Sequence, residues 1–253
     1  MTDADFFNWL KTKQSNGKLS QLQVDGMNEL LTVVKPEVLK DSLSKLNGWS
    51  EALPTNSKKL SKADIIAVAN SLGVEPAAMK AVIDVEAAGE GFDKQGRPTI
   101  LFEPHIFWRE LTKINYITKR NELSKSYPGI LSPKWDKNLY KLGNSYDKLA
   151  KASELHWEAA HNSCSWGLGQ IMGFNATKIG YPNLKEFIDD MYESEAKQLK
   201  AMGMFLKANG LISKLKAKDW AGFARGYNGS GYAANKYDTK LASAYTRAKK
   251  NGW

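Results

Sequence analysis

Cysteine and histidine are scarce in this sequence, which has one cysteine, Cys164, and three histidines among 253 residues. A single cysteine excludes an intrachain disulfide, which agrees with synthesis in a reducing compartment. A structural zinc site usually takes four ligands that are mostly cysteine or histidine, and the chain contains no His-Glu-x-x-His segment. We therefore expect no metal site and no cofactor.

Long apolar runs are also missing, since no stretch approaches the roughly 18 consecutive apolar residues of a membrane-spanning helix. Residues 1–7 begin acidic and lack the basic start and the apolar core of a secretory signal. These absences predict a chain that is made in the cytoplasm without a signal peptide. If it acts elsewhere, something else must release it.

Positive charge and aromatic residues are what the sequence has in plenty. Lysine and arginine number 36 against 27 acidic residues, for a formal charge of +9, and there are 8 Trp, 10 Tyr and 9 Phe. The apolar content is enough for a packed core. The charge favours a polyanionic partner such as nucleic acid, an anionic membrane or a cell wall, although solubility alone explains it equally well. No nucleic-acid-binding motif is present and the lysines are dispersed, so we expect no nucleic-acid partner.

The apolar pattern is helical nearly throughout, which predicts a mainly α fold of the α+β class with one small β element. Residues 99–102 are short, apolar and bounded by prolines, and they are the best strand candidate. Ser61 and Asp64 have the spacing of a capping box, and Gly73 suits a left-handed helix end. Helices are expected within residues 3–17, 20–34, 36–46, 61–73, 76–88, 104–111, 151–160, 167–171, 184–209, 219–227 and 238–250.

A domain boundary is predicted in the polar, proline-containing stretch 49–59. It divides the chain into an N-terminal helical segment with its linker, residues 1–55, and a larger domain, residues 56–253. No internal repeat or low-complexity tract is visible. The chain is expected to be a monomer.

Glu86 is the first candidate for chemistry, because it lies in the last turn of an otherwise apolar predicted helix. Met79, Val82 and Ile83 precede it on the same face. Partial burial and the negative end of the helix both oppose ionisation and would raise its pKa. A carboxyl with a raised pKa is what a general acid for glycosidic cleavage needs. A carboxylate paired with one of the many lysines is the structural alternative.

Two glycine-rich segments supply further candidates. Residues 165–172 alternate glycine with apolar residues and carry Ser165 and Gln170, whose polar groups could bind an amide or a hydroxyl. Residues 225–232 combine Tyr227 and Asn228 with glycines at a helix end, a composition that suits sugar binding through ring stacking and amide hydrogen bonds. Each segment is equally consistent with helix packing or an ordinary turn.

The order and spacing of these segments are more specific than any one of them. Residues 84–92 and 96–107 together closely resemble the N-acetylmuramidase domain of phage endolysins. Residues 165–175 are similar to that family's second signature, which lytic transglycosylases also share, and residues 227–229 resemble a third element. The resemblance covers about residues 60–253.

The resemblance implies a lysozyme-like fold and cleavage of the β-1,4 bond between N-acetylmuramic acid and N-acetylglucosamine in peptidoglycan. Glu86 matches the family's catalytic glutamate. The family's usual Glu-Ser-Gly-Gly is here Glu86 followed by Ala-Ala-Gly, and its acid before Gly-Arg-Pro is here Gln95. The position of any second carboxylate is therefore open. Gln95, His105, Ser165, Gln170, Tyr227 and Asn228 become candidate substrate-binding residues.

Two mechanisms follow from this ambiguity. An inverting hydrolase places its two carboxyl groups about 6.5–9.5 Å apart, with the second acting as base. The candidates for that base are Asp93, Glu90 and Glu103. Asp93 ranks slightly ahead as the base, and a structural role is preferred for Glu103. His105 could orient Glu103. In the alternative, Glu86 acts alone and the substrate's own hydroxyl attacks, which gives the anhydro product of a lytic transglycosylase. A non-catalytic wall-binding protein is the competing class.

The ends of the chain have no motif of comparable strength. Residues 1–55 could form a small wall-binding unit or helices that pack on the catalytic domain, and packing is the preferred interpretation. The C-terminal end is basic and partly amphipathic, so it could engage an anionic membrane or lipopolysaccharide, or be only a solvated helix end. The family further implies release from the host cytoplasm through a holin-type pore and action on periplasmic peptidoglycan during host cell lysis.

Overall fold

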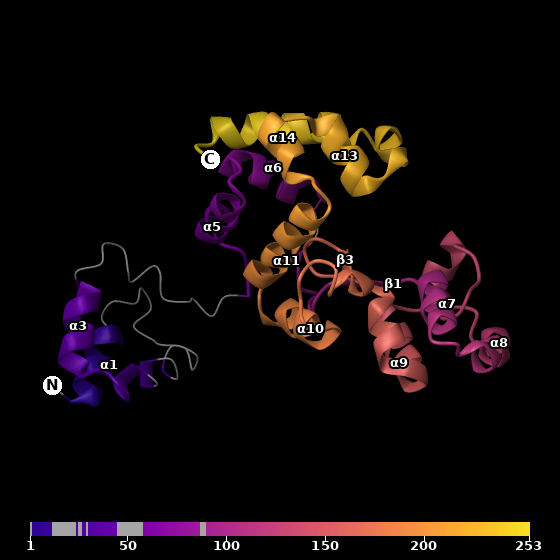
Figure 1. Cartoon of the computed structure of the whole chain (residues 1–253), viewed down its shortest axis with the longest axis horizontal. Coiled ribbons are helices and arrows are strands. Elements are labelled where there is room, and N and C mark those ends of the chain that lie inside the picture. The colour runs from indigo at the N-terminus through magenta and orange to yellow at the C-terminus, as the bar shows by residue number, and fades with distance from the viewer. Residues whose placement is uncertain (1, 12–23, 25–26, 29, 45–57, 87–89) are drawn as a thin grey trace. The chain divides into compact units, whose positions relative to one another are not determined.

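The computed structural model describes residues 2–11, 24, 27–28, 30–44, 58–86 and 90–253. Its contacts divide the chain into two units, Met1–Ser57 and Lys58–Trp253. Seven of the fifteen residues of the predicted helix over 20–34 lie outside the described residues, as does the predicted linker over 49–59 except for Lys58 and Lys59. The element labels below are those of Figure 1.

The first unit contains α1 (Asp3–Lys11) and α3 (Pro36–Ser44). The aromatic and leucine side chains of α1 repeat at helical spacing, so they share one face. Phe6 and Leu10 are fully buried there, and Leu31 and Leu39 pack against them. The nitrogen of Lys40 lies 5.4 Å from the centre of the Trp9 ring. This unit therefore has a small apolar centre of its own.

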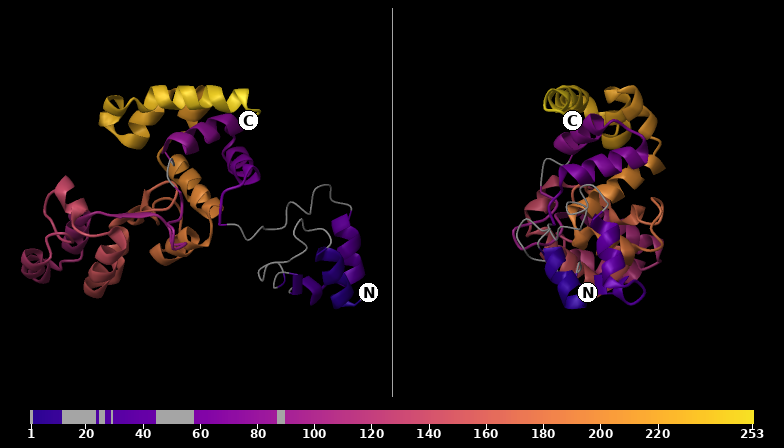
Figure 2. Two further views of the ribbon diagram at one scale, coloured as in Figure 1. Left: turned by 180° about the vertical axis from the view of Figure 1, so that it is seen from behind. Right: turned by 90° about the vertical axis from the view of Figure 1, so that its left-hand side faces the viewer.

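The second unit is mainly helical. It contains α5 (Lys62–Leu72), α6 (Pro76–Glu86), β1 (Ile100–Phe102), α7 (Pro104–Lys113), α8 (Ile117–Ser126), η1 (Lys137–Lys141), α9 (Ser145–Asn162), β2 (Cys164–Trp166), β3 (Ile171–Met172), η2 (Gly173–Asn175), α10 (Leu184–Glu193), α11 (Glu195–Ala208), α12 (Ile212–Ala217), α13 (Trp220–Asn228), η3 (Ser230–Asn235) and α14 (Tyr237–Lys250). In the two views, α14 runs alongside α6, and the two helices are in contact (Figures 1 and 2).

The predicted helix signals at the start of this unit are confirmed. Ser61 and Asp64 form a reciprocal capping box, and Gly73 ends α5 in the left-handed conformation at φ +61°. Pro76 then opens α6, where its lack of an N–H costs nothing. In the described residues no single helix is long and apolar enough to cross a membrane; α5 and α6 satisfy that criterion only as a pair bent by 114°.

Two apolar cores lie within the second unit. One gathers the strands with α7, α9 and α10 around Phe107, Trp166 and Phe187, and the other gathers α5, α6, α13 and α14 around Met79 and Phe223. Helix α11 serves both: Ala201 packs in the first core, and its Leu199, Met202 and Leu206 side chains pack in the second. The small sheet and α11 thus connect the two halves of the unit.

The predicted small β element is confirmed and is a three-stranded sheet, whereas the predicted helix over 167–171 was wrong. Strands β1, β2 and β3 form an antiparallel sheet in that order, with Leu101 opposite Ser165 and Ser165 opposite Met172. Residues 167–170 are the hairpin turn between β2 and β3. Gly167 and Gln170 both have positive φ, +62° and +46°, which a helix excludes.

The predicted helix over 184–209 is two helices. Ser194 is extended at φ −163° and ψ 159°, and its hydroxyl accepts a hydrogen bond from the Lys197 N–H as the N-cap of α11. A serine side chain competes with the helix for backbone N–H groups, so it starts a new helix here. The break gives α10 and α11 separate directions across the sheet.

Candidate active site

Glu86 is the last residue of α6, whose buried face positions it. Met79 and Val82 are fully buried and Ile83 nearly so, in the core shared with α13 and α14. Because residues three, four and seven positions apart lie on one helix face, Glu86 continues that face at its open end. Its side chain is half-buried. This is the environment that the helical pattern predicted.

The electrostatics of Glu86 favour its neutral form. Burial raises the pKa of its carboxyl, while a hydrogen bond from Asn228 and the charge of Lys240 oppose that rise without cancelling it. The side-chain nitrogen of Asn228 donates to Glu86 Oε1 over 2.9 Å. Among the described side chains, no cation forms an ion pair with Glu86. A carboxyl of this kind can carry a proton closer to neutral pH than an ordinary glutamate.

Tyr227 joins α13 to the hairpin turn beside this carboxyl. Its hydroxyl donates to the carbonyl oxygen of Gly169 over 3.0 Å, and its ring stacks on Phe223 with 5.7 Å between centroids. Burial and the nearby charge of Glu86 raise the pKa of the Tyr227 hydroxyl, so it remains a neutral donor. Tyr227 therefore anchors the turn, and Asn228, the next residue, reaches Glu86.

Ser165 and Gln170 lie together in the hairpin and bond to each other. The Ser165 hydroxyl donates to Gln170 Oε1 over 2.7 Å. The Gln170 amide nitrogen donates to the carbonyl oxygens of Gly167 at 2.9 Å and Thr99 at 3.2 Å. These bonds hold the left-handed backbone of Gln170 and attach the turn to the start of β1. The predicted substrate-binding groups of both residues are thus engaged within the protein.

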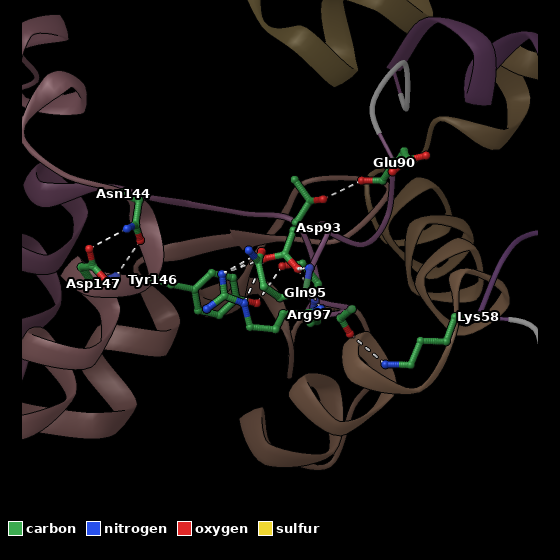
Figure 3. A network of polar contacts seen from close by, with 11 residues as sticks. Lys58, Glu90, Asp93, Gln95, Arg97, Asn144, Tyr146 and Asp147 are labelled. Atoms are coloured by element: carbon green, nitrogen blue, oxygen red, sulfur yellow. Dashed lines mark hydrogen bonds and ion pairs between the residues drawn. The ribbon is translucent and has the colours of Figure 1, made fainter.

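Asp93 lies in a tight turn that ties it to Arg97 (Figure 3). Its Oδ1 accepts from the backbone N–H groups of Gln95 and Arg97 at 2.9 and 3.0 Å, and its Oδ2 accepts from the Arg97 guanidinium at 2.9 and 2.8 Å. Burial works to raise the pKa of Asp93, but these hydrogen bonds outweigh it and lower the pKa. The guanidinium also lies 3.8 Å from the ring centre of Tyr146.

Glu103 lies at the other end of β1 with its own partners. The Tyr140 hydroxyl donates to Glu103 Oε2, and His105 Nδ1 lies 3.4 Å from the same oxygen. The predicted pairing of His105 with Glu103 is present. Glu90, the third candidate base, is an exposed residue whose carboxylate pairs with Lys59 at 3.0 Å.

The predicted residues therefore form three groups. Glu86 and Asn228 are bonded directly, with Tyr227 adjacent; Ser165 bonds to Gln170, and Tyr227 ties this turn to α13. Asp93 and Gln95 belong to the Arg97 turn, and Glu103 and His105 form the third group. Within the described part of the chain, no hydrogen bond or ion pair links Asp93 or Glu103 to Glu86.

Comparison of the sequence with known protein families gives a match that covers these residues. The family model for N-acetylmuramidase matches residues 75–249, which span all three groups. The chain belongs to the N-acetylmuramidase family. As a member of this family, it is a peptidoglycan-cleaving enzyme.

A solved structure agrees with that assignment. Burkholderia AP3 phage endolysin, whose crystal structure is known, is 36% identical to this chain in sequence. The two structures superpose with a TM-score of 0.69, and the match covers 83% of this chain and 78% of the endolysin chain. No curated protein matches the chain in sequence. The mainly α, lysozyme-like endolysin fold predicted from the sequence is confirmed.

Two buried polar residues of this muramidase were not predicted from the sequence. The amide of Gln198 in α11 accepts from Leu168 N–H at 2.7 Å and donates to the carbonyl oxygens of Gly91 and Met191 at 3.1 and 2.8 Å. Glu195, one turn earlier, accepts from Gly91 N–H at 3.0 Å and Leu60 N–H at 2.7 Å.

These two side chains attach two loops of the candidate site to α11. One loop is the segment after α6 that contains Gly91, and the other is the hairpin turn. A Cβ added at Gly91 or Gly167 would lie 2.3 or 2.6 Å from the Gln198 side chain, so only glycine allows this approach. The sequence signal that could have revealed Glu195 and Gln198 is the presence of two polar residues on the face of a helix that is otherwise apolar and buried.

Replacement of Asn228 by leucine is expected to shift the pH profile of this muramidase. The variant removes the hydrogen bond that lowers the pKa of Glu86, and the leucine side chain still excludes water from that side of the carboxyl. The pKa of Glu86 then rises further. If Glu86 is the general acid, it works while it is protonated, so the alkaline limb of kcat/KM moves to higher pH. The exposed Asn235→Leu is the control; an alkaline limb that stays in place or moves to lower pH would contradict this account.

Proposed function

We propose that this enzyme cleaves the β-1,4 bond between N-acetylmuramic acid and N-acetylglucosamine, with Glu86 as the general acid, during lysis of a bacterial host by a phage. The observation that carries the proposal is the half-buried Glu86 carboxyl. Its pKa is raised by burial, and among the described residues the side chain that donates a hydrogen bond to it is neutral Asn228. Such a group can deliver a proton to the leaving glycosidic oxygen. The endolysin likeness supports the lytic setting.

Hydrolysis with a second carboxylate is one form of the reaction. Asp93 is the first candidate for the base, as ranked from the sequence; Glu90 is another, and Glu103 was preferred as a structural residue. Asp93 retains a lowered pKa, which keeps it ionised. The substrate-binding roles of Gln95, His105, Ser165, Gln170, Tyr227 and Asn228 belong to the same proposal.

The lytic transglycosylase is the second candidate function, and a specific observation favours it. Both oxygens of Asp93 accept hydrogen bonds from the Arg97 turn, and Glu103 is bonded to Tyr140. A carboxylate held by a guanidinium is a weak base. These bonds favour a mechanism in which Glu86 first donates its proton to the leaving glycosidic oxygen. The Glu86 carboxylate then accepts the proton of the muramic acid's own 6-hydroxyl as that oxygen attacks C1, which gives the 1,6-anhydro product.

Mass spectrometry of the muropeptides released from purified peptidoglycan tests the proposal. Reducing N-acetylmuramic ends would support hydrolysis, and products lighter by one water, with 1,6-anhydro ends, would support the transglycosylase. Reducing N-acetylglucosamine ends would show that the other glycosidic bond is cut and would overturn the assignment. Release of no glycan fragment at all would favour the wall-binding class.

The variant Asp93→Asn separates the two mechanisms. If the Asp93 carboxylate only holds the Arg97 turn, as its bonds suggest, we expect kcat/KM to fall less than about tenfold, with a lower Tm because the ion pair is lost. Loss of a true general base costs about 10²–10⁴-fold. The surface ion-pair residue Asp84, changed to Asn, is the control. A loss in that larger range with an unchanged Tm would make Asp93 the base.

Peptidoglycan is the main partner in this proposal, and the basic C-terminal end offers a second contact. The exposed cations of α14 and its start are Lys236, Lys240, Arg247, Lys249 and Lys250. Lys249 is paired with Glu75 at 2.6 Å, whereas the other four have no ion pair among the described residues. They support the interpretation that this end meets an anionic membrane or lipopolysaccharide.

A further inference from the structure

A cavity away from Glu86 is built around a buried lysine. It has a volume of about 330 Å³ and lies between the end of α8 with the loop that follows it and the first turns of α9. Gly129 and Leu142 bring its two walls together, since a Cβ at Gly129 would lie 3.2 Å from the Leu142 side chain. Its lining includes Ser126, Tyr127, Gly129, Leu142, Lys148 and Lys151.

Lys148 is the feature that sets this cavity apart. It is 5% exposed and is the only buried lysine in the described part of the chain. Its ammonium donates to the carbonyl oxygen of Leu139 over 2.6 Å, and it forms no ion pair with any described carboxylate. Burial lowers the pKa of Lys148. A buried cation with one neutral acceptor retains donors and charge that an anion would satisfy.

The other charged groups around the cavity leave a net positive balance. Lys151 lies one turn further along α9 and is exposed, and Asp147 is the one acidic residue of the lining. The Asp147 carboxylate is already bonded to the side-chain nitrogen of Asn144 at 2.5 Å. The lining therefore contains two lysines and one engaged carboxylate, a net positive charge that suits a small anionic group.

We propose that this cavity binds a carboxylate of the peptidoglycan stem peptide, held by Lys148 and assisted by Lys151. The inference rests on the proposed function, because that function supplies the substrate class. Peptidoglycan carries free carboxylates on the peptides attached to muramic acid, and the cavity is large enough for one terminal amino acid. Such a site would make the enzyme prefer glycan strands that bear stem peptides.

Binding is tested by titrating ¹⁵N-labelled full-length protein with N-acetyl-D-alanyl-D-alanine, with its neutral C-terminal amide, and with inorganic phosphate. The dipeptide should give saturable shifts of the Gly129, Gly143 and Lys148 amide signals, with an affinity at least about tenfold above that of the neutral amide. Lys148→Met should weaken dipeptide binding at least about tenfold. Lys151→Glu, an exposed change that leaves the fold intact, should also weaken it, and Lys207→Met is the control.

Three results would overturn the inference: no saturable shifts, equal binding of the neutral amide, or full binding by folded Lys148→Met. Tighter binding of phosphate than of dipeptide would instead assign the site to a phosphate-bearing ligand and overturn the stem-peptide assignment. If Lys148→Met does not fold, Lys151→Glu decides the matter, and unchanged binding by that variant contradicts the proposal.

A second assay separates this inference from the proposed function. Muropeptide or glycan release is measured on intact peptidoglycan and on strands whose stems have been removed by an amidase. Lys148→Met should be slower than wild type on intact peptidoglycan and equal to it on stemless strands. If Lys148→Met and wild type cleave at the same rate on intact peptidoglycan as well as on stemless strands, the stem site alone is overturned. If wild type releases nothing from either substrate, the proposed function is overturned.

Discussion

Glu86→Gln is expected to lower kcat/KM for peptidoglycan cleavage by about 10²–10⁴-fold, the usual contribution of a general acid. Glutamine keeps the shape of the side chain and can still accept the Asn228 hydrogen bond, but it has no proton to give. Release of soluble muropeptides measures the loss. The exposed Glu158→Gln, which removes an acid that belongs to none of the candidate groups, is the matched control and should retain activity.

The same variant is expected to be more stable than wild type at neutral pH. Because burial raises the pKa of Glu86 in the folded state, ionisation of this group costs folding free energy. The cost is absent below the ordinary glutamate range and appears as pH rises through the raised pKa. Glutamine avoids it, so the gain in Tm should be largest near neutral pH and vanish in acid. A Tm gain that grows toward acid would contradict the burial argument.

Gln198→Leu is expected to produce the largest loss of stability. It leaves the Leu168 N–H and the carbonyl oxygens of Gly91 and Met191 without their bonds to Gln198. Each buried polar group stranded in this way costs about 1–3 kcal/mol. A domain of this size loses roughly 2–4 °C of Tm per kcal/mol, so we expect a fall of several degrees or more.

Activity should fall as well, at temperatures where Gln198→Leu is still folded. In the wild type, the Gln198 side chain bonds to both the segment that follows Glu86 and the hairpin turn. Its loss therefore makes the position of these two loops relative to each other less fixed. Circular dichroism at the assay temperature and muropeptide release separate the two effects. Lys200→Leu, an exposed change on the same helix, is the control. A Tm within about 1 °C of wild type would show that the three groups find other partners.

The environment of Glu86 was predictable because local rules determine it. Apolar residues at helical spacing define the face of α6, Pro76 fixes its start, and the carboxyl at its end must be half-buried. The capping box at Ser61 and the left-handed Gly73 follow from equally local chemistry. The pairing of Glu103 with His105 was also within reach, since the two residues are adjacent in the β1–α7 corner.

The rest depends on contacts between distant segments. Residues 167–171 have glycines and apolar residues at a spacing that suits a helix, but antiparallel pairing of Cys164–Trp166 with Ile171–Met172 makes residues 167–170 a hairpin turn. Gln198 interacts with loops 30 and 107 positions away in sequence, which no local pattern reveals. The engagement of Asp93 by Arg97 similarly needed the conformation of the turn, because spacing alone left Asp93 free to act as a base.

Direct titration of Glu86 is the measurement that tests the central claim most directly. Carboxyl signals of ¹³C-labelled protein can be followed by NMR across pH, with Glu86→Gln assigning the resonance. The account predicts a pKa above the ordinary glutamate range, matching the alkaline limb of kcat/KM for peptidoglycan. A Glu86 pKa at or below that ordinary range, or an alkaline limb that does not follow it, would contradict the assignment of Glu86 as the general acid.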